Sequence, residues 1–192
     1  MAKLTPEPVF LGLLEAQTSY GYHLLDQFRS TEQLGRIWNL SSSQLYAILK
    51  RLEREELIEG REESRPDAPM RTVYWLTDSG REHLYQWLND ADPSPSTRYI
   101  RTEFLSRLYI AELLGQPSGA IIDAQRAACE RHRDSLVSQQ VHPVGRIAGL
   151  ALDLRRRELD LILDWLDTCR RPQRATPTTR SDSHRSAGSQ PH

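Results

Sequence analysis

The chain has 192 residues, of which 38% are hydrophobic and 27% charged, and its formal net charge is −1. No apolar run approaches the roughly 20 residues that a membrane helix needs, and the N-terminal segment lacks the pattern of a secretory signal. These features exclude a membrane-spanning protein and favour a cytoplasmic one. Cys129, Cys169 and the six histidines show no metal-ligand spacing, so the sequence predicts no metal site and no cofactor.

Two helices are predicted in the first thirty residues. The first is expected to begin near Thr5 and Pro6, because proline fits the first helical turn. Its core-facing residues are Val9, Phe10, Leu13 and Leu14. The second carries Tyr20, Leu24 and Phe28 at the spacing i, i+4, i+8. We interpret Tyr20 and Tyr22 as packing residues with polar tips outward, rather than as stacking groups for a ligand.

Residues 41–56 carry the most informative pattern, which is that of a capped amphipathic helix. Ser41 and Gln44 are spaced as a capping box, in which each residue satisfies a free backbone N–H of the other. An apolar stripe follows at i, i+3, i+4 and i+7, formed by Leu45, Ile48, Leu49 and Leu52. The opposite face has small residues near its start and cations further along. Such a helix can lie in a DNA major groove with its N-terminal part towards the base edges.

A β-hairpin is expected next. Residues 57–62 and 71–76 read as strands, the second rich in β-branched and aromatic residues, and the loop between them contains Pro66 and Pro69. A further helix is predicted over residues 78–89. Helix, hairpin and helix is the order of a winged helix. On periodicity alone, a small α+β domain whose charged helix face is merely solvated explains the pattern equally well.

Several short segments point to one family. They are Leu11-Gly12-Leu13-Leu14, Ser19-Tyr20-Gly21-Tyr22-His23-Leu24-Leu25, Leu40-Ser41, Leu45-Tyr46, Leu49-Lys50-Arg51-Leu52-Glu53, Glu56-Leu57-Ile58, Tyr74-Trp75-Leu76-Thr77 and Gly80-Arg81. In order and spacing, residues 5–90 resemble the PadR-like winged-helix transcriptional regulators. Gln44 and Glu56 stand where that family usually has Gly, and Ala47 where it usually has Pro. The resemblance implies a repressor that binds an inverted-repeat operator in double-stranded DNA as a homodimer.

In a winged helix of this kind, the expected DNA contacts fall on two elements. Near the start of the helix, Ser42, Ser43 and Gln44 reach base edges, and Tyr46 meets a phosphate or a thymine methyl group. Further along, Lys50 and Arg54 meet phosphates or guanine edges. On the wing, the residues expected to approach the neighbouring backbone are Arg61, Arg65 and Arg71.

The charge of this region is unusual for a DNA-binding domain. Residues 1–90 hold ten Lys and Arg against fourteen Asp and Glu, a net charge of −4. Phosphate contacts supply much of the affinity of DNA-binding proteins, so attraction here depends on local placement of cations and on a dimer. A winged helix that acts as a protein–protein interaction module, without sequence-specific DNA binding, therefore stays open as an alternative.

The remaining chain is expected to be helical. Residues 91–97 form a linker with two prolines, and helices are predicted over 98–114, 118–140 and 144–170. We interpret residues 98–171 as a dimerisation and effector domain, which resembles the C-terminal helical domain of many PadR-like regulators. Residues 172–192 are rich in Arg, Ser, Thr and Pro and are predicted to be a disordered tail.

The last predicted helix has an apolar arc wider than the roughly 100° stripe that packing on one domain needs. A second subunit is expected to cover part of it, most simply in a two-fold dimer. The predicted interface residues are Leu150, Leu154, Leu159, Leu161, Ile162, Trp165 and Leu166.

A small aromatic effector is expected in a groove between the winged helix and the helical domain. The residues predicted to border it are Tyr99, Phe104, Tyr109 and Trp165, although plain core packing also explains them. The sequence has no nucleophile elbow, no Gly-rich phosphate loop and no carboxylate or histidine constellation with catalytic spacing. It therefore predicts a regulator rather than an enzyme.

Overall fold

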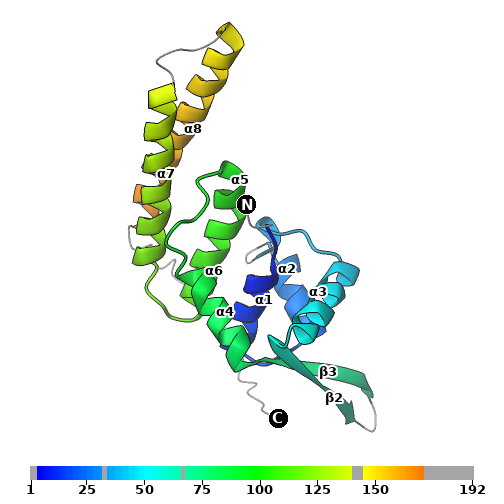
Figure 1. Ribbon diagram of the computed structural model, residues 1–192. Helices are drawn as coiled ribbons and strands as arrows, with labels where there is room; N and C mark the ends of the chain where they lie inside the picture. Colours follow the sequence, from blue (N-terminus) through cyan, green and yellow to red (C-terminus); the bar gives the residue numbers. More distant parts are fainter. Residues whose placement is uncertain (1–3, 32–33, 66–67, 140–144, 171–192) are drawn as a thin grey trace, which may run out of the picture.

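The computed structural model describes residues 4–31, 34–65, 68–139 and 145–170 (Figure 1). The elements are α1 (Glu7–Ala16), β1 (Ser19–Tyr20), α2 (Gly21–Arg29), α3 (Ser42–Arg54), β2 (Ile58–Arg65), β3 (Ala68–Leu76), α4 (Asp78–Leu88), α5 (Thr97–Tyr99), α6 (Leu105–Leu113), α7 (Gly119–Gln139) and α8 (Arg146–Cys169). A 3₁₀ turn at Leu34–Arg36 precedes α3, and a π-helical turn at Ile100–Phe104 joins α5 to α6. The three strands form one antiparallel sheet in the order β1-β3-β2. The predicted fold class, mainly α with a β-hairpin wing, is confirmed.

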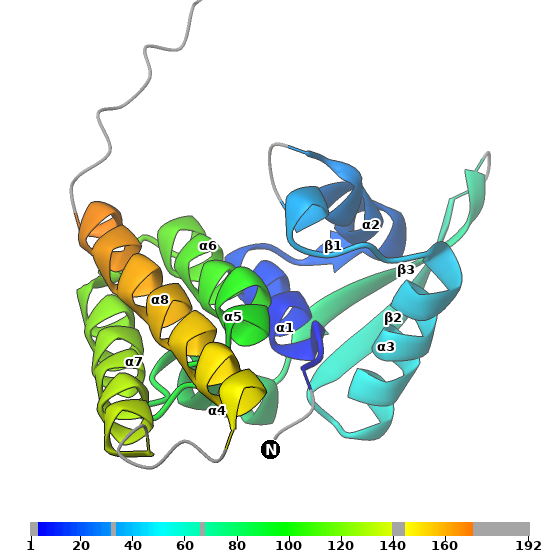
Figure 2. The ribbon, with the colours of Figure 1, turned by 90° about the horizontal axis from the view of Figure 1, so that it is seen from above.

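Helix α1 forms the centre of the N-terminal half. It is buried over most of its length rather than along one stripe, as expected of a helix that is apolar on all sides. Seen from above, α1 lies between the rod of α5 and α6 on one side and the strands on the other (Figure 2). This helix therefore fixes the position of the sheet, and with it the wing.

The start of α3 has the predicted capping box. The backbone N–H of Ser41 donates to Oε1 of Gln44 (2.9 Å), and the backbone N–H of Gln44 donates to Oγ of Ser41 (3.2 Å). Four apolar side chains, Leu45, Ile48, Leu49 and Leu52, are buried as expected. The cap fixes the first residue of α3, and the stripe fixes which face of the helix is turned to solvent.

The end of α3 shows why glycine is the usual residue at the position of Glu56 in the family that the sequence resembles. The N–H of Leu57 donates to the carbonyl of Leu52 (2.9 Å), and that of Glu56 to the carbonyl of Glu53 (3.0 Å), which together make a Schellman motif. That motif needs one residue in the left-handed backbone conformation, and Glu56 adopts this conformation with a φ of 56°. Glycine adopts this conformation at lower cost, so Glu56 is a strained residue at the entry to the wing.

The hairpin is longer than predicted. The strands reach Arg65 and Ala68, so Pro69 lies in β3 instead of in a loop. Strand β1 pairs only with Val73 and Tyr74, which leaves β3 with a neighbour on one side at Pro69. Proline is tolerated at such an edge because no hydrogen-bond donor is required there. The prediction of a loop containing Pro69 was therefore wrong.

Helix α6 is tied to the winged helix by side chains. Trp38 Nε1 donates to Oγ of Ser106 (2.8 Å), and the Tyr109 hydroxyl donates to Oε1 of Gln27 (3.2 Å). Arg107 is only 2% exposed. Its Nη2 lies 2.8 Å from Oδ2 of Asp90 and 2.7 Å from Oε1 of Glu103, and the guanidinium carbon lies 5.5 Å from the centroid of the Trp87 ring. The predicted second domain thus begins with a helix that packs on the first.

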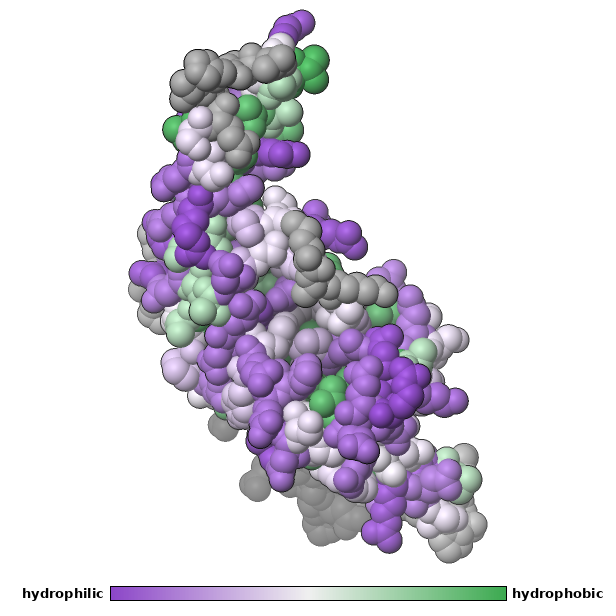
Figure 3. Space-filling model, viewed as in Figure 1, coloured by the Kyte–Doolittle hydropathy of each residue, from purple (hydrophilic) through white to green (hydrophobic). Residues whose placement is uncertain are grey.

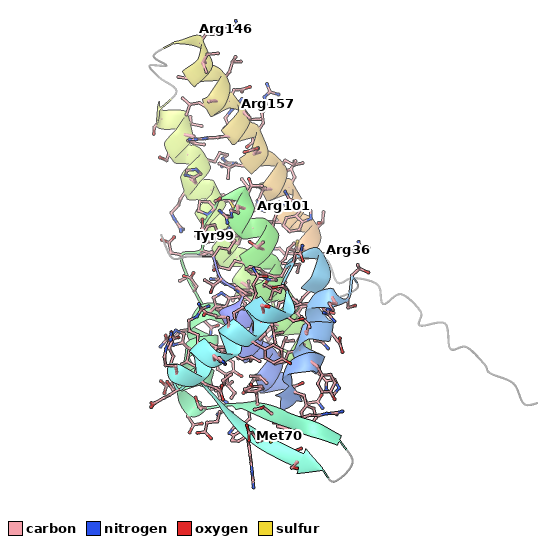
Figure 4. The ribbon with its side chains drawn as sticks, turned by 90° about the vertical axis from the view of Figure 1, so that its right-hand side faces the viewer. Arg36, Met70, Tyr99, Arg101, Arg146 and Arg157 are labelled. Atoms are coloured by element: carbon pink, nitrogen blue, oxygen red, sulfur yellow. The ribbon has the colours of Figure 1, made fainter. Side chains whose placement is uncertain are left out.

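Helices α7 and α8 form an antiparallel hairpin that projects from the body, with Arg146 and the wing residue Met70 at opposite ends of the molecule (Figure 4). One face of the C-terminal half of α8, with Leu159, Ile162, Leu163 and Leu166, is buried against the chain. Its N-terminal half exposes apolar side chains, and Figure 3 shows hydrophobic residues on the surface where α8 begins. None of the described helices combines the length and apolar composition that a membrane crossing needs. The predicted tail and the interruption at residues 142–143 lie outside the described residues.

Candidate nucleic-acid interface

The solvent-facing side of α3 carries the residues that the sequence predicts to meet DNA. Because its apolar stripe is buried, the opposite side chains are turned outward: Ser43, Gln44, Tyr46, Lys50 and Arg54 are exposed. Ser42 is half-buried, and its Oγ accepts a hydrogen bond from Nη2 of Arg29 (3.4 Å). Side chains of the first helical turn and cations of the later turns therefore lie on one surface, as base and phosphate contacts require.

The wing supplies further cations beside this surface. Arg61 of β2 and Arg71 of β3 are exposed. The backbone of Arg65 pairs with that of Ala68, whereas the Arg65 side chain lies outside the described part of the structure. Figure 4 shows α3 (cyan) directly above the wing, where Met70 marks strand β3.

The start of α2 joins α3 to the wing, which the periodicity of the sequence did not predict. The Tyr46 ring lies 3.0 Å from the position that a Cβ atom of Gly21 would take, so any larger residue would push the ring aside. Tyr22 is 38% exposed. Nη1 of Arg71 donates to the Tyr22 hydroxyl (3.3 Å), and the guanidinium carbon lies 5.3 Å from the centroid of the Tyr22 ring. Tyr22 is therefore part of the candidate surface and not only a packing residue.

Four cations of this surface are exposed to solvent. Among the described residues, none forms an ion pair with Lys50, Arg54, Arg61 or Arg71. Arg51, by contrast, pairs with Glu7 of α1 and is only half exposed. The acidic residues of the wing lower the overall potential but leave these four cations available to an external anion.

A carboxylate approaches the buried side of the wing. Glu53 of α3 lies beside Gly60 of β2, with its Oε1 2.5 Å from the position of an added Cβ atom. Burial, and then the charge of Glu53, raises the pKa of the Tyr74 hydroxyl above its usual value. This side of the hairpin therefore serves packing, and the opposite side carries Arg61 and Arg71.

Residues 10–86 match the model of the transcriptional regulator PadR-like family. This segment, which forms the winged helix, belongs to the PadR-like family of transcriptional regulators. The chain is 34% identical to the negative transcriptional regulator PadR of Bacillus subtilis over 106 residues, which are 55% of this chain and 56% of that relative. The PadR-like chain spans about half the length of the curated relatives that it matches.

Solved structures of the same family are similar over more of the chain. One is Bacillus subtilis PadR in complex with operator DNA, with 25% identity, a TM-score of 0.44, and coverage of 85% of this chain and 94% of that chain. Another is Bacillus subtilis PadR in complex with p-coumaric acid, with 23% identity, a TM-score of 0.41, and coverage of 88% and 96%.

The four residues predicted to border an effector groove in this PadR-like chain do not line one common cavity in the structure. Phe104 is 1% exposed and packs edge-on against Trp165, with ring centroids 5.9 Å apart. The Tyr109 hydroxyl donates a hydrogen bond to Gln27. Of the four predicted residues, Tyr99 lines the cavity of about 580 Å³ between residues 90–95, α5 and α7. Its other lining side chains include Asp92, Glu103, Arg131 and His132.

The residues predicted for the dimer interface divide into two groups. Leu159, Ile162 and Leu166 are buried within the chain itself, and Trp165 is half-buried on Phe104. Leu150, Leu154 and Leu161 are 55%, 59% and 70% exposed. The second group, with Ile147 at 75%, leaves an apolar stripe on α8 of the PadR-like chain. The surface free for a second subunit is thus narrower than the apolar arc predicted from the sequence.

Proposed function

We propose that this PadR-like chain is a transcriptional repressor that binds an inverted-repeat operator in double-stranded DNA as a homodimer. The observation that carries the proposal is the surface formed by α3, the start of α2 and the wing. On it, Lys50, Arg54, Arg61 and Arg71 are exposed and unpaired among the described residues. The relative of Bacillus subtilis is a negative regulator, which supports repression over activation.

Base recognition is assigned to the first turn of α3. Gln44 uses its side-chain oxygen in the capping box, so its amide nitrogen remains to donate to an acceptor on a base edge. Ser43 is exposed beside it and can donate or accept. A recognition helix places its N-terminal residues against base edges in the major groove, which suits this arrangement.

The dimer is assigned to the exposed stripe of α8. At 100° per residue, Ile147, Leu150, Leu154 and Leu161 lie within about 60° of one another around the helix. Apolar patches of this kind on a soluble domain mark interaction sites. A second copy that meets the stripe through a two-fold axis would cover the same residues on both chains. Two DNA-binding surfaces on one dimer would then offset the weak attraction to DNA that follows from the net charge of −4 of residues 1–90.

The deciding experiment is selection of bound fragments from a genomic DNA pool with the purified protein. We expect enrichment of a palindromic sequence. Lack of enrichment even at low salt would favour the alternative, a winged helix that binds a partner protein.

Variants then test the surface itself. Replacing Lys50, Arg54 and Arg71 by alanine should weaken binding strongly and lower the salt dependence by about one ion for each lost phosphate contact. A control with the same loss of charge replaces Arg101 of the π-helical turn together with Arg133 and Arg157 of the α7–α8 hairpin, and should retain binding. Equal binding by both triple variants would assign DNA binding to another surface.

The cavity beside Tyr99 is our proposed place for a small aromatic effector. Its volume of about 580 Å³ lies within the range of small-molecule sites. Titration with planar aromatic compounds should change both the intrinsic fluorescence and the affinity for the selected DNA. If no compound changes either quantity, regulation by a partner protein becomes the better account.

A further inference from the structure

Two oppositely charged residues face each other across the wing without forming an ion pair. In the register of β2 and β3, Glu63 is the direct partner of Arg71. Side chains at directly opposed positions lie close enough to interact, and opposite charges there attract. Nevertheless, no ion pair joins Glu63 to Arg71 among the described residues.

Each of the two charged groups is bound instead to a different tyrosine of one short segment. The Tyr20 hydroxyl donates to Oε2 of Glu63 (2.9 Å), and Nη1 of Arg71 donates to the Tyr22 hydroxyl (3.3 Å). The two rings are stacked, with centroids 5.6 Å apart and planes at 15°. The second ring is also held by His23, whose centroid is 4.1 Å away. The carboxylate and the guanidinium are thus drawn to separate members of one aromatic stack.

This arrangement has a clear electrostatic effect. A direct pair with Glu63 would neutralise Arg71 and reduce its attraction for an anion. The ring of Tyr22 attracts the cation through its π face without cancelling the charge. The Tyr22 hydroxyl accepts from Arg71 and so keeps its own proton available to donate.

We propose that Tyr20 and Tyr22 are positioning residues that keep Arg71 unpaired for a DNA phosphate, and that the Tyr22 hydroxyl donates to the same phosphate. Tyr20 acts by engaging Glu63, and Tyr22 acts by holding the guanidinium. The proposal deepens the DNA-binding function and rests on it. It adds to the DNA surface two residues that sequence periodicity assigns to packing.

The test uses the full chain and the DNA fragment enriched by selection. Tyr20→Phe removes only the hydroxyl that binds Glu63, so the carboxylate becomes free to pair with Arg71. We expect affinity to fall about 1.5-fold to fivefold for each half-site, the range that exposed ion pairs allow. Glu63→Gln added to Tyr20→Phe should restore the affinity of the parent or exceed it. Rescue by a second change on another strand is not expected if Tyr20→Phe had merely damaged the fold.

The salt dependence gives a second reading. Tyr20→Phe should lower the slope of log K against log salt by as much as Arg71→Ala does, and the two changes together should lower it no further. Tyr22→Phe, which keeps the ring under Arg71, should weaken binding less than Tyr22→Leu. As a control, Tyr85→Phe on α4 removes a hydroxyl that accepts from Gln116, far from the wing, and should leave binding unchanged.

The outcomes separate the two proposals. If Arg71→Ala and the triple variant both bind as the parent does, the DNA surface itself is wrong. If Arg71→Ala weakens binding while Tyr20→Phe does not, only the positioning role of Tyr20 is overturned. Failure of Glu63→Gln to rescue Tyr20→Phe overturns that role as well.

Discussion

Gly80 of α4 is in direct contact with the carbonyl group of Leu57, which lies between the end of α3 and the first strand of the wing. A Cβ atom at Gly80 would lie 1.9 Å from the Leu57 oxygen, which is too short for any side chain. The same oxygen accepts from the backbone N–H of Thr77 (3.2 Å), the residue that caps α4. The two ends of the hairpin are therefore joined where α4 begins.

Substitution of Gly80 should destabilise the protein strongly. Gly80→Ala forces backbone atoms apart, because the obstacle is a main-chain carbonyl and not a flexible side chain. We expect a loss of about 1–3 kcal/mol or more in the free energy of unfolding, measured by urea denaturation. Gly119→Ala at the start of α7 is the matched control, because nothing lies within 4 Å of the added atom. Equal stability of the two variants would contradict the contact.

A stabilising change is expected at Glu56. Its φ of 56° is the left-handed conformation that costs a non-glycine residue energy. Glu56→Gly should raise the free energy of unfolding by about 0.5–1 kcal/mol, after allowance for the larger backbone entropy that glycine loses. Glu55→Gly, at a φ of −85°, has no such strain to relieve and should not stabilise. A lower urea midpoint for Glu56→Gly would show that the side chain outweighs the strain.

The carboxylates around Arg107 should respond to pH in opposite directions. Burial acts to raise the pKa of Asp90, but hydrogen bonds from Arg107 and the Asp92 N–H outweigh it and hold the pKa below its usual value. Burial raises the pKa of Glu103 above its usual value in spite of Arg107. Asp90 therefore stabilises the fold above about pH 4 and loses that effect on acidification. Glu103 contributes its stability below about pH 4.3 and loses it as the pH rises through the folded pKa.

Variants separate these two effects. Asp90→Asn should reduce the loss of stability below about pH 4, whereas Glu103→Gln should reduce the change just above about pH 4.3. Urea denaturation at a series of pH values measures both. Parallel curves for the parent and both variants would mean that neither carboxylate changes its pKa on folding.

The stripe on α8 gives a prediction about assembly. Leu150→Glu with Leu154→Glu places two charges where the second subunit is proposed to pack, so the protein should become monomeric in light scattering. Both side chains are exposed, and the change should not unfold the chain. Leu113→Glu on α6, which is 43% exposed and lies away from the stripe, should leave the assembly unchanged. A dimer that survives the α8 substitutions would require another interface.

Local patterns were sufficient for much of the fold. The capping box of Ser41 and Gln44 located α3, and its stripe located the face that the structure turns to solvent. The extent of β3 depends instead on its pairing with β2 as far as Arg65, which the residues around Pro69 do not encode. The absence of β1 beyond Val73 then lets proline lie in the strand. The contact of Tyr22 with Arg71 joins residues 49 positions apart, so it follows from strand register and not from spacing. On α8, periodicity predicted a broad apolar arc, but only the packing of α7 and Phe104 divides it into a buried and an exposed side.

Because α6 packs on the winged helix, the two cannot be separated without loss of contacts when the chain is truncated. A fragment ending in the linker at residues 91–97 would deprive Trp38 of its partner Ser106 and uncover the side of α1 on which α6 packs. A fragment that keeps both of these contacts therefore extends at least to Leu113, the end of α6. A chimaera that exchanges the winged helix between two relatives should carry α6 with it, because a junction in the linker would pair the exchanged winged helix with a foreign α6.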